Sequence, residues 1–164
     1  MRNFDYSSVG SYFVTVDTRF RAREFGAIIN GEMHLSDIGA FTQQCIADIP
    51  LHFPSILVPE FVVMPDHIHI ILDLGSSYEL AKVQEIGAQD EIFQLKKNRF
   101  SKPIAGSVSV VIQQLKAAVK RWCNNNGHEH FQWLGRFHVR LIQNEDAFRR
   151  IQRYIQQNPS KWKY

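Results

Sequence analysis

The chain has 164 residues, of which 45% are hydrophobic and 21% charged, so it holds enough apolar material for one compact domain with a packed core. At that length we expect no second full domain, and we expect residues 1–164 to form a single unit. The formal net charge of +3 is compatible with a basic face that meets phosphate.

The sequence also excludes some locations. No apolar run approaches the roughly 20 residues that a membrane helix needs, and the N-terminus lacks the pattern of a signal peptide. Cys45 and Cys123 form no CxxC pair and lie on or beside helical apolar stripes, so we expect buried thiols rather than a disulfide or a zinc site. These features predict a cytoplasmic protein with no membrane partner.

A strand and a hairpin are predicted to open the fold. The strand covers residues 12–16, and after an arginine-dotted segment at 19–23 the Asn30-Gly31 pair is typical of a tight hairpin turn. A helix then begins at Ser36, a typical N-cap residue, and runs to Pro50. Its apolar stripe consists of Ile38, Phe41, Cys45 and Ile49.

The middle of the chain is rich in Val and Ile and indicates two adjacent strands. They are joined by Met64-Pro65-Asp66, which is suitable turn chemistry, and the second strand begins at His67. Residues 75–107 mix glycine, serine and charged residues without a sustained period. A long, partly flexible insertion is therefore predicted at about 75–107.

Three elements are predicted in the C-terminal part. A helix covers residues 109–123, a strand covers 137–142, and Asn144 caps a last helix that Pro159 stops. Because hairpins imply antiparallel pairing, this order predicts an α+β fold with helices packed on one sheet. The ferredoxin-like (RRM-like) layout is the simplest arrangement that fits.

His67 and His69 are the first candidate functional residues. Side chains two apart on a strand point to the same face, so both imidazoles project together and can share one metal ion, whereas Ile68 points to the core. Such pairs also occur on strands without metal. Among the other histidines, His128 and His130 form the weaker alternative pair.

The last helix carries the second candidate, Tyr154. Phe148, Ile151 and Ile155 make the buried stripe, and at ~100° per residue Tyr154 falls at its edge, from which a hydroxyl can face a cleft. The alternative is an ordinary boundary tyrosine that packs its ring and hydrogen-bonds its tip.

Asn158 lies one helical turn beyond Tyr154, and its amide oxygen is a candidate third metal ligand. Alternatively, Asn158 simply terminates the helix before Pro159, and Gln156 or Gln157 supplies the amide. Histidine and amide ligands leave positions open on a divalent cation such as Mg²⁺ or Mn²⁺. A metal that polarises a phosphodiester would assist a tyrosine, which is a weak nucleophile at neutral pH.

Several ordered motifs resemble those of one known family. FVVMPDHIHIIL at 61–72 is similar to a His-hydrophobic-His signature strand, and RIQRYIQQNPSKW at 150–162 is similar to a tyrosine-helix signature. The similarity extends to YFVTVDTRFR, NGEMHLSDIGAF, GSVSVVIQQLKAAVKR and FQWLGRFHVRLI, in the same order. The chain thus resembles the REP-associated tyrosine transposases, which belong to the HUH-type single-tyrosine transposase superfamily.

This resemblance implies a ferredoxin-like domain that recognises hairpin-forming single-stranded DNA, cleaves it and carries the 5′ phosphate on tyrosine. It implies metal binding by His67 and His69, and a nucleophilic Tyr154. Asn158 matches a polar position at which related insertion-sequence transposases have a metal-binding Gln. The 75–107 segment departs from the family pattern. Both a monomer and a homodimer with exchanged tyrosine helices occur among such proteins, and both stay open here.

The candidate DNA contacts are basic residues of the helix at 109–123, of the region of the last strand and of the arginine-dotted segment: Lys116, Lys120, Arg136, Arg140 and residues 19–23. Trp133 and Phe137 are candidates for stacking on unpaired bases. For each one, the alternative is a solvated charge or a core aromatic.

Two other functions fit parts of the pattern. The first is an inactive RRM-like module in which Tyr12, Phe13 or Phe61 stacks on single-stranded nucleic acid. The second is a metallohydrolase that uses water on small phosphoesters and needs no tyrosine. The presence of both histidines and the tyrosine within their motifs favours the nuclease.

Overall fold

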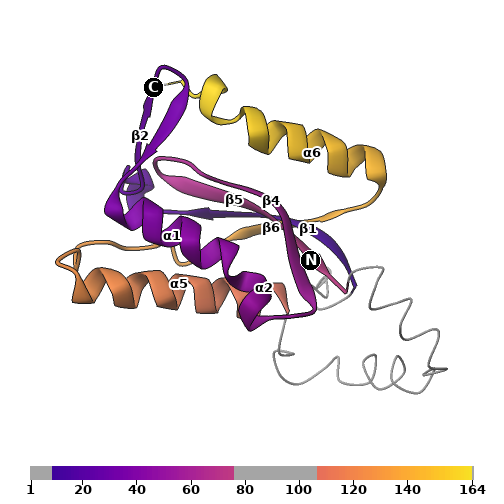
Figure 1. Ribbon diagram of the computed structural model, residues 1–164, viewed down its shortest axis with the longest axis horizontal. Coiled ribbons are helices and arrows are strands. Elements are labelled where there is room, and N and C mark those ends of the chain that lie inside the picture. Colours follow the sequence, from indigo (N-terminus) through magenta and orange to yellow (C-terminus); the bar gives the residue numbers. More distant parts are fainter. Residues whose placement is uncertain (1–8, 76–106, 164) are drawn as a thin grey trace.

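The computed structural model describes residues 9–75 and 107–163 (Figure 1). Most of the insertion predicted at 75–107 lies outside the described residues. The elements are, in chain order, β1 (Gly10–Asp17), η1 (Arg19–Arg21), β2 (Gly26–Ile29), β3 (Glu32–Leu35), α1 (Asp37–Ala47), α2 (Ile49–His52), β4 (Ile56–Val63), β5 (His67–Leu74), α5 (Val108–Asn125), β6 (His138–Ile142), α6 (Glu145–Gln157) and η2 (Pro159–Lys161).

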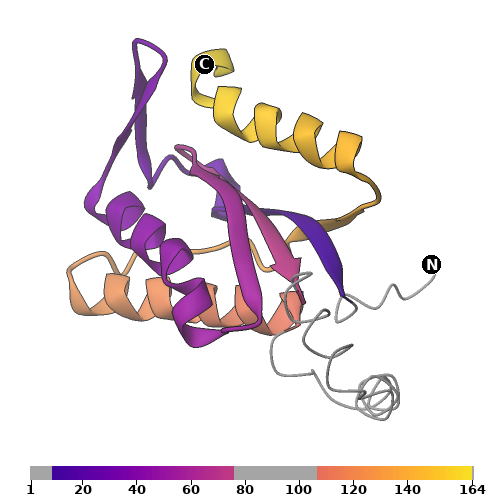
Figure 2. The same cartoon turned by 45° about the vertical axis from the view of Figure 1, so that its right-hand side comes forward.

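The centre of the fold is a four-stranded sheet with strand order β4-β5-β1-β6, in which every neighbouring pair is antiparallel. Helices α1 and α5 cover one face and α6 crosses the other, as Figures 1 and 2 show from two directions. This is the predicted α+β, ferredoxin-like arrangement, and the prediction is confirmed. The β2–β3 hairpin is a separate two-stranded sheet inserted between β1 and α1.

The main core lies between the sheet and the α1/α5 layer. Alternate residues of β1 point into it, and Tyr12, Val14 and Val16 have no solvent exposure. A smaller apolar cluster of Ile71, Ile142 and Ile155 joins the opposite face of the sheet to α6. Because side chains alternate along β1 and β5, the residues between those core positions point toward α6. That face of the sheet therefore also carries polar side chains.

The local signals in the sequence place most elements correctly. Asn30 and Gly31 both adopt positive φ values, 52° and 78°, as a two-residue hairpin turn requires. The Ser36 side chain accepts a hydrogen bond from the Gly39 amide at 3.1 Å and caps α1. In the same way, Asn144 accepts from the Ala147 amide at 2.8 Å and caps α6.

The first helix differs from its prediction. It ends at Ala47, and Pro50 lies in the first turn of the short helix α2 instead of stopping α1. The fully buried face contains Thr42 and Ile46, whereas Phe41 and Cys45 are half-buried. The buried face thus includes Thr42, which tolerates burial because its hydroxyl donates to the Ile38 carbonyl.

Two further expectations concern thiols and membranes. Cys45 and Cys123 are both free, and Cys123 is buried whereas Cys45 is only half-buried. Among the helices within residues 9–75 and 107–163, none combines the length and hydrophobicity that a membrane crossing requires.

Candidate active site

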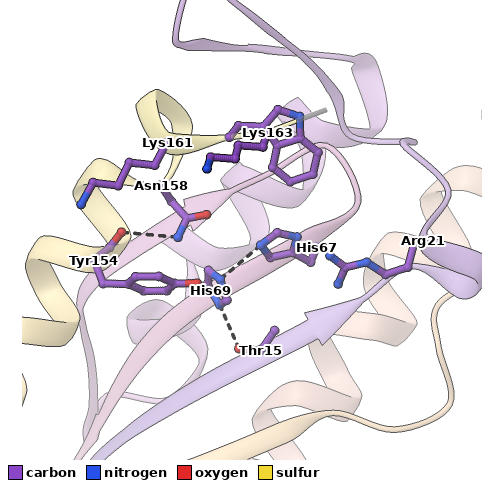
Figure 3. A pocket seen from close by; sticks show the side chains of 9 residues that line it. Thr15, Arg21, His67, His69, Tyr154, Asn158, Lys161 and Lys163 are labelled. Carbon is purple, nitrogen blue, oxygen red and sulfur yellow. Dashed lines mark hydrogen bonds between the residues drawn. The ribbon is translucent and has the colours of Figure 1, made fainter.

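His67 and His69 project from β5 toward α6 and lie side by side (Figure 3). Each residue is 6% exposed, and their Nε2 atoms are 3.1 Å apart. Both point to the face opposite Ile68, which is fully buried in the main core. The alternation of the strand therefore brings two buried imidazoles together, as the sequence predicts.

Each imidazole is held in place through its other nitrogen. His67 Nδ1 donates to Asp66 Oδ1 at 2.6 Å, and the second oxygen of Asp66 is 3.2 Å from Arg21 Nε. His69 Nδ1 is 2.8 Å from the hydroxyl of Thr15, which lies directly opposite it in the β1–β5 register. Because a hydroxyl can donate or accept, Thr15 accommodates either tautomer of His69. These contacts leave both Nε2 atoms facing the gap between the rings.

Burial sets the protonation state of His69. Burial, reinforced by the nearby His67 and Arg21, lowers the pKa of His69 from 6.5 to about 3. The imidazole is therefore neutral at physiological pH. A neutral imidazole has the lone pair that a metal ligand needs.

Tyr154 reaches this pair from α6. The ring centroids of Tyr154 and His69 are 5.4 Å apart, and the Tyr154 ring meets Phe13 edge-on at 6.2 Å. Tyr154 is 51% exposed, whereas Ile155 beside it is fully buried. This edge position was predicted from the helical period, and it leaves the tyrosine accessible at the rim of the histidine pair (Figure 3).

Asn158 lies in the same cavity as Tyr154 and both histidines. Its Nδ2 is 3.4 Å from the Tyr154 carbonyl, so the amide is held over the last turn of α6. The two alternative amides bond elsewhere: Lys161 donates to Gln157 Oε1 at 2.7 Å, and Gln156 donates to Glu60 at 2.9 Å.

These residues enclose a cavity of about 390 Å³, which we call the histidine cavity. Its lining is Thr15, Arg21, His67, His69, Tyr154, Asn158, Lys161, Trp162 and Lys163. The Trp162 ring lies beside His67, with 6.1 Å between centroids. Arg21 is ion-paired with Asp17 and Asp66, whereas the two lysines of the lining, Lys161 and Lys163, favour an anionic ligand such as a phosphodiester.

The donor atoms fit a divalent cation. Two ligand atoms that bind one ion at about 2.1 Å and at right angles are about 3.0 Å apart, close to the Nε2–Nε2 distance of 3.1 Å. No cluster of three or more His, Cys, Asp or Glu side chains that could bind a metal occurs within residues 9–75 and 107–163. Asn158 is the amide side chain that lines the same cavity, which makes it the candidate for a third protein ligand.

The remaining predicted residues lie in different places. Lys116 and Lys120 belong to α5, on the other side of the sheet, and their ammonium groups donate to the carbonyls of Leu134, Glu129 and Phe131. Arg136 is exposed in the loop before β6. Arg140 lies on β6, with its guanidinium 5.8 Å from the centre of the Phe13 ring.

The aromatic and histidine alternatives also have structural contacts. Trp133 packs against Phe25, 5.4 Å between ring centroids, and donates its indole N–H to the Lys116 carbonyl. Phe137 packs against the main core. His130 is 3.2 Å from a Glu24 carboxylate oxygen, and His128 stacks on Trp122, so this pair lies outside the histidine cavity.

Sequence reasoning missed several residues that line the histidine cavity or contact its histidines. Thr15 could be found only from the strand register, which sequence does not supply. Asp66 directly precedes His67, and Lys161 and Lys163 directly follow the tyrosine helix, so proximity was the available signal for them.

The same arrangement of elements occurs in solved proteins. A REP-associated tyrosine transposase, solved bound to a REP hairpin, superposes with a TM-score of 0.61 at 20% identity, over 98% of this chain and 72% of its own. The chain has the fold of a tyrosine transposase. A transposase candidate from Deinococcus radiodurans shares that fold with a TM-score of 0.50 at 16% identity, over 95% of each chain.

Sequence comparison adds one relative. An uncharacterised protein of Haemophilus influenzae is 29% identical over 164 residues, which cover 99% of this chain and 87% of that protein. No protein-family model matches the chain.

Proposed function

We propose that the protein is a metal-dependent tyrosine transposase that cuts and rejoins single-stranded DNA beside a hairpin. The observation that carries the proposal is the histidine cavity, in which an exposed tyrosine lies beside two buried imidazoles. A boundary tyrosine or a core histidine pair alone would not explain their meeting in one cavity that two lysines also line. The hairpin-bound transposase of the same fold supports a DNA hairpin as the ligand.

Tyr154 is the proposed nucleophile. Its phenol oxygen attacks the scissile phosphorus, the bond from phosphorus to the 3′ oxygen breaks, and the DNA 5′ phosphate becomes attached to the tyrosine. The phenol loses its proton to solvent, and the departing 3′ oxygen gains one. A later attack by a DNA 3′ hydroxyl on the phosphotyrosine rejoins strands and frees Tyr154 without ATP.

His67, His69 and Asn158 are proposed to hold the cation, Mg²⁺ or Mn²⁺. A cation bound there would polarise a phosphate oxygen and offset the charge that develops on it. Asp66 and Thr15 hydrogen-bond the Nδ1 atoms of His67 and His69 and so fix the orientation of the two imidazoles. Hydrogen-bond partners of this kind orient metal-binding histidines and raise the metal affinity of a site. The low pKa of His69 keeps its imidazole neutral, so that a ring nitrogen has a lone pair available to bind the cation.

The cations of the histidine cavity are proposed to orient the DNA. Arg21 is held by Asp66 and Asp17, so its charge is largely neutralised and it mainly positions Asp66. Lys161 and Lys163 are exposed at the cavity and can meet the phosphates on either side of the cut. Such an activity would place the protein on cytoplasmic, nucleoid-associated DNA.

The proposal is tested with end-labelled, hairpin-forming single-stranded oligonucleotides, including repeats from the host genome, on denaturing gels. With Mn²⁺ or Mg²⁺ we expect a covalent protein–DNA band that disappears in EDTA, in Tyr154→Phe and in His67→Ala. His52→Gln changes an exposed histidine outside the histidine cavity and should leave the band intact. Binding without any adduct across many hairpins would overturn the proposal in favour of an inactive binding module.

A further inference from the structure

A second cavity of about 760 Å³ lies between β1, β6 and the first half of α6, and we call it the β6 cavity. Its volume is within the range of roughly 300–1,000 Å³ that small-ligand sites occupy. Its lining is Phe13, Thr15, His69, Arg140, Leu141, Ile142, Gln143, Asn144, Ala147, Arg150, Ile151 and Tyr154. Thr15, His69 and Tyr154 also line the histidine cavity, so the two cavities meet at the tyrosine.

An aromatic ring and a guanidinium lie together in the β6 cavity. Phe13 and Arg140 are direct partners in the β1–β6 register, so both side chains point to the α6 side of the sheet. The Arg140 guanidinium carbon is 5.8 Å from the centre of the Phe13 ring. Phe13 also contacts the rings of His69, at 5.2 Å, and Tyr154, at 6.2 Å. Flat rings and guanidinium groups are the surfaces on which unpaired bases stack.

The charge of the β6 cavity suits a phosphate. Arg140 and Arg150 are both exposed, and neither has an ion-pair partner within residues 9–75 and 107–163. No Asp or Glu contributes to its lining in the part of the chain that the structure describes. Near the start of α6, the Gln143 amide and the amide nitrogen of Asn144, whose oxygen caps the helix, can bond to the edge of a base.

We propose that the β6 cavity binds the unpaired nucleotide next to the phosphate that Tyr154 attacks. Its base stacks on Phe13 beside Arg140, and its outer phosphate pairs with Arg150. A phosphodiester placed at Tyr154 has one nucleotide on each side of it along the DNA strand. The β6 cavity opens directly beside that tyrosine and can take one of these two nucleotides. This inference rests on the proposed function, since it takes the DNA strand as the ligand of the neighbouring cavity.

The base contact is tested on cleavage-deficient Tyr154→Phe protein, to which DNA binds without being cut. The hairpin oligonucleotides carry 2-aminopurine at each unpaired position in turn, because the fluorescence of this base falls when it stacks. We expect strong quenching at one position, loss of that quenching in the added Phe13→Leu change, and retention in Phe13→Tyr, which keeps a flat ring. Unchanged quenching in Phe13→Leu at every position would overturn the inference.

The phosphate contact is tested on the surface of α6, where folding is not at risk. Arg150→Ala should weaken hairpin binding several-fold. It should also reduce the salt slope, meaning the slope of the logarithm of the binding constant against the logarithm of the salt concentration, by about one in magnitude. Arg149→Ala removes an equal charge from the same helix outside both cavities, and it should leave the slope unchanged. Equal salt slopes for Arg150→Ala and wild type would contradict the assignment of Arg150.

Cleavage separates this inference from the proposed function. An abasic site at the quenched position should slow adduct formation by wild type about tenfold, and Phe13→Leu should cut the intact and abasic strands at similar rates. If wild type forms the adduct but is indifferent to that base, the inference about the β6 cavity fails and the proposed function stands. If no hairpin gives an adduct, the proposed function fails, whereas the quenching still reports on Phe13.

Discussion

Acidification should destabilise the metal-free protein through His69. The unfolded chain binds a proton at this histidine near pH 6.5, whereas the folded protein does so only near pH 3. Between those values the unfolded state binds more protons, so the free energy of unfolding falls as the pH falls. The stabilisation is fully present above the unfolded pKa and is lost progressively toward pH 3.

The size of the effect follows from the width of that window. Each pH unit within it lowers the free energy of unfolding by about 1.4 kcal/mol, so His69 alone accounts for about 2 kcal/mol between pH 6.5 and 5. Domains of this kind are stable by only about 5–15 kcal/mol, so such a loss is easily measured.

The assay is urea unfolding followed by tryptophan fluorescence at pH 7, 6 and 5 in the presence of EDTA. His69→Asn removes the titrating group, and its unfolding free energy should therefore depend less on pH than that of wild type, by about 2 kcal/mol over the range. His52→Gln changes an exposed histidine and should follow wild type. Equal pH dependence in wild type and His69→Asn would refute the assignment of a buried, neutral imidazole.

Three further changes test other parts of the structure. Thr15→Val removes the hydroxyl at His69 Nδ1 and should lower Mn²⁺ affinity, measured by calorimetry, at least tenfold; unchanged affinity would contradict the orienting role. Gly26→Ala places a Cβ 2.0 Å from the His34 carbonyl oxygen at a residue with φ 138°. It should lower the free energy of unfolding in urea by about 3 kcal/mol, whereas Gly127→Ala, whose Cβ would meet open space, should lower it by about 1 kcal/mol. Lys120→Met breaks hydrogen bonds to two loop carbonyls and should lower the thermal midpoint by several degrees, unlike Lys161→Met.

Much of this fold could be predicted because its elements carry strong local signals. The Asn30-Gly31 turn, the Ser36 and Asn144 caps and the turn before His67 are chemical signals that act within a few residues. The histidine pair follows from strand alternation alone. Tyr154 could be placed at the edge of its helix, but its meeting with the histidines depends on how α6 crosses the sheet.

What sequence could not supply is the register and packing between distant segments. Thr15 reaches His69 because β1 and β5 pair in one particular register. Lys116 and Lys120 carry the right charge for DNA, yet α5 packs on the face of the sheet away from the histidine cavity. The end of α1 was misplaced because Pro50 is tolerated in the first turn of a new helix as readily as it ends an old one.

The origin of the side chains in the histidine cavity also determines how reaction rate depends on protein concentration. Tyr154, both histidines and Asn158 line one cavity of a single chain, so under the proposed function one molecule carries every proposed catalytic and metal-binding side chain. With DNA in saturating excess, the rate of adduct formation is then first order in protein concentration. The rate per protein molecule does not change on dilution. For the same reason, we expect a mixture of Tyr154→Phe and His67→Ala proteins to stay inactive, whereas a dimer with exchanged tyrosine helices would recover activity in that mixture.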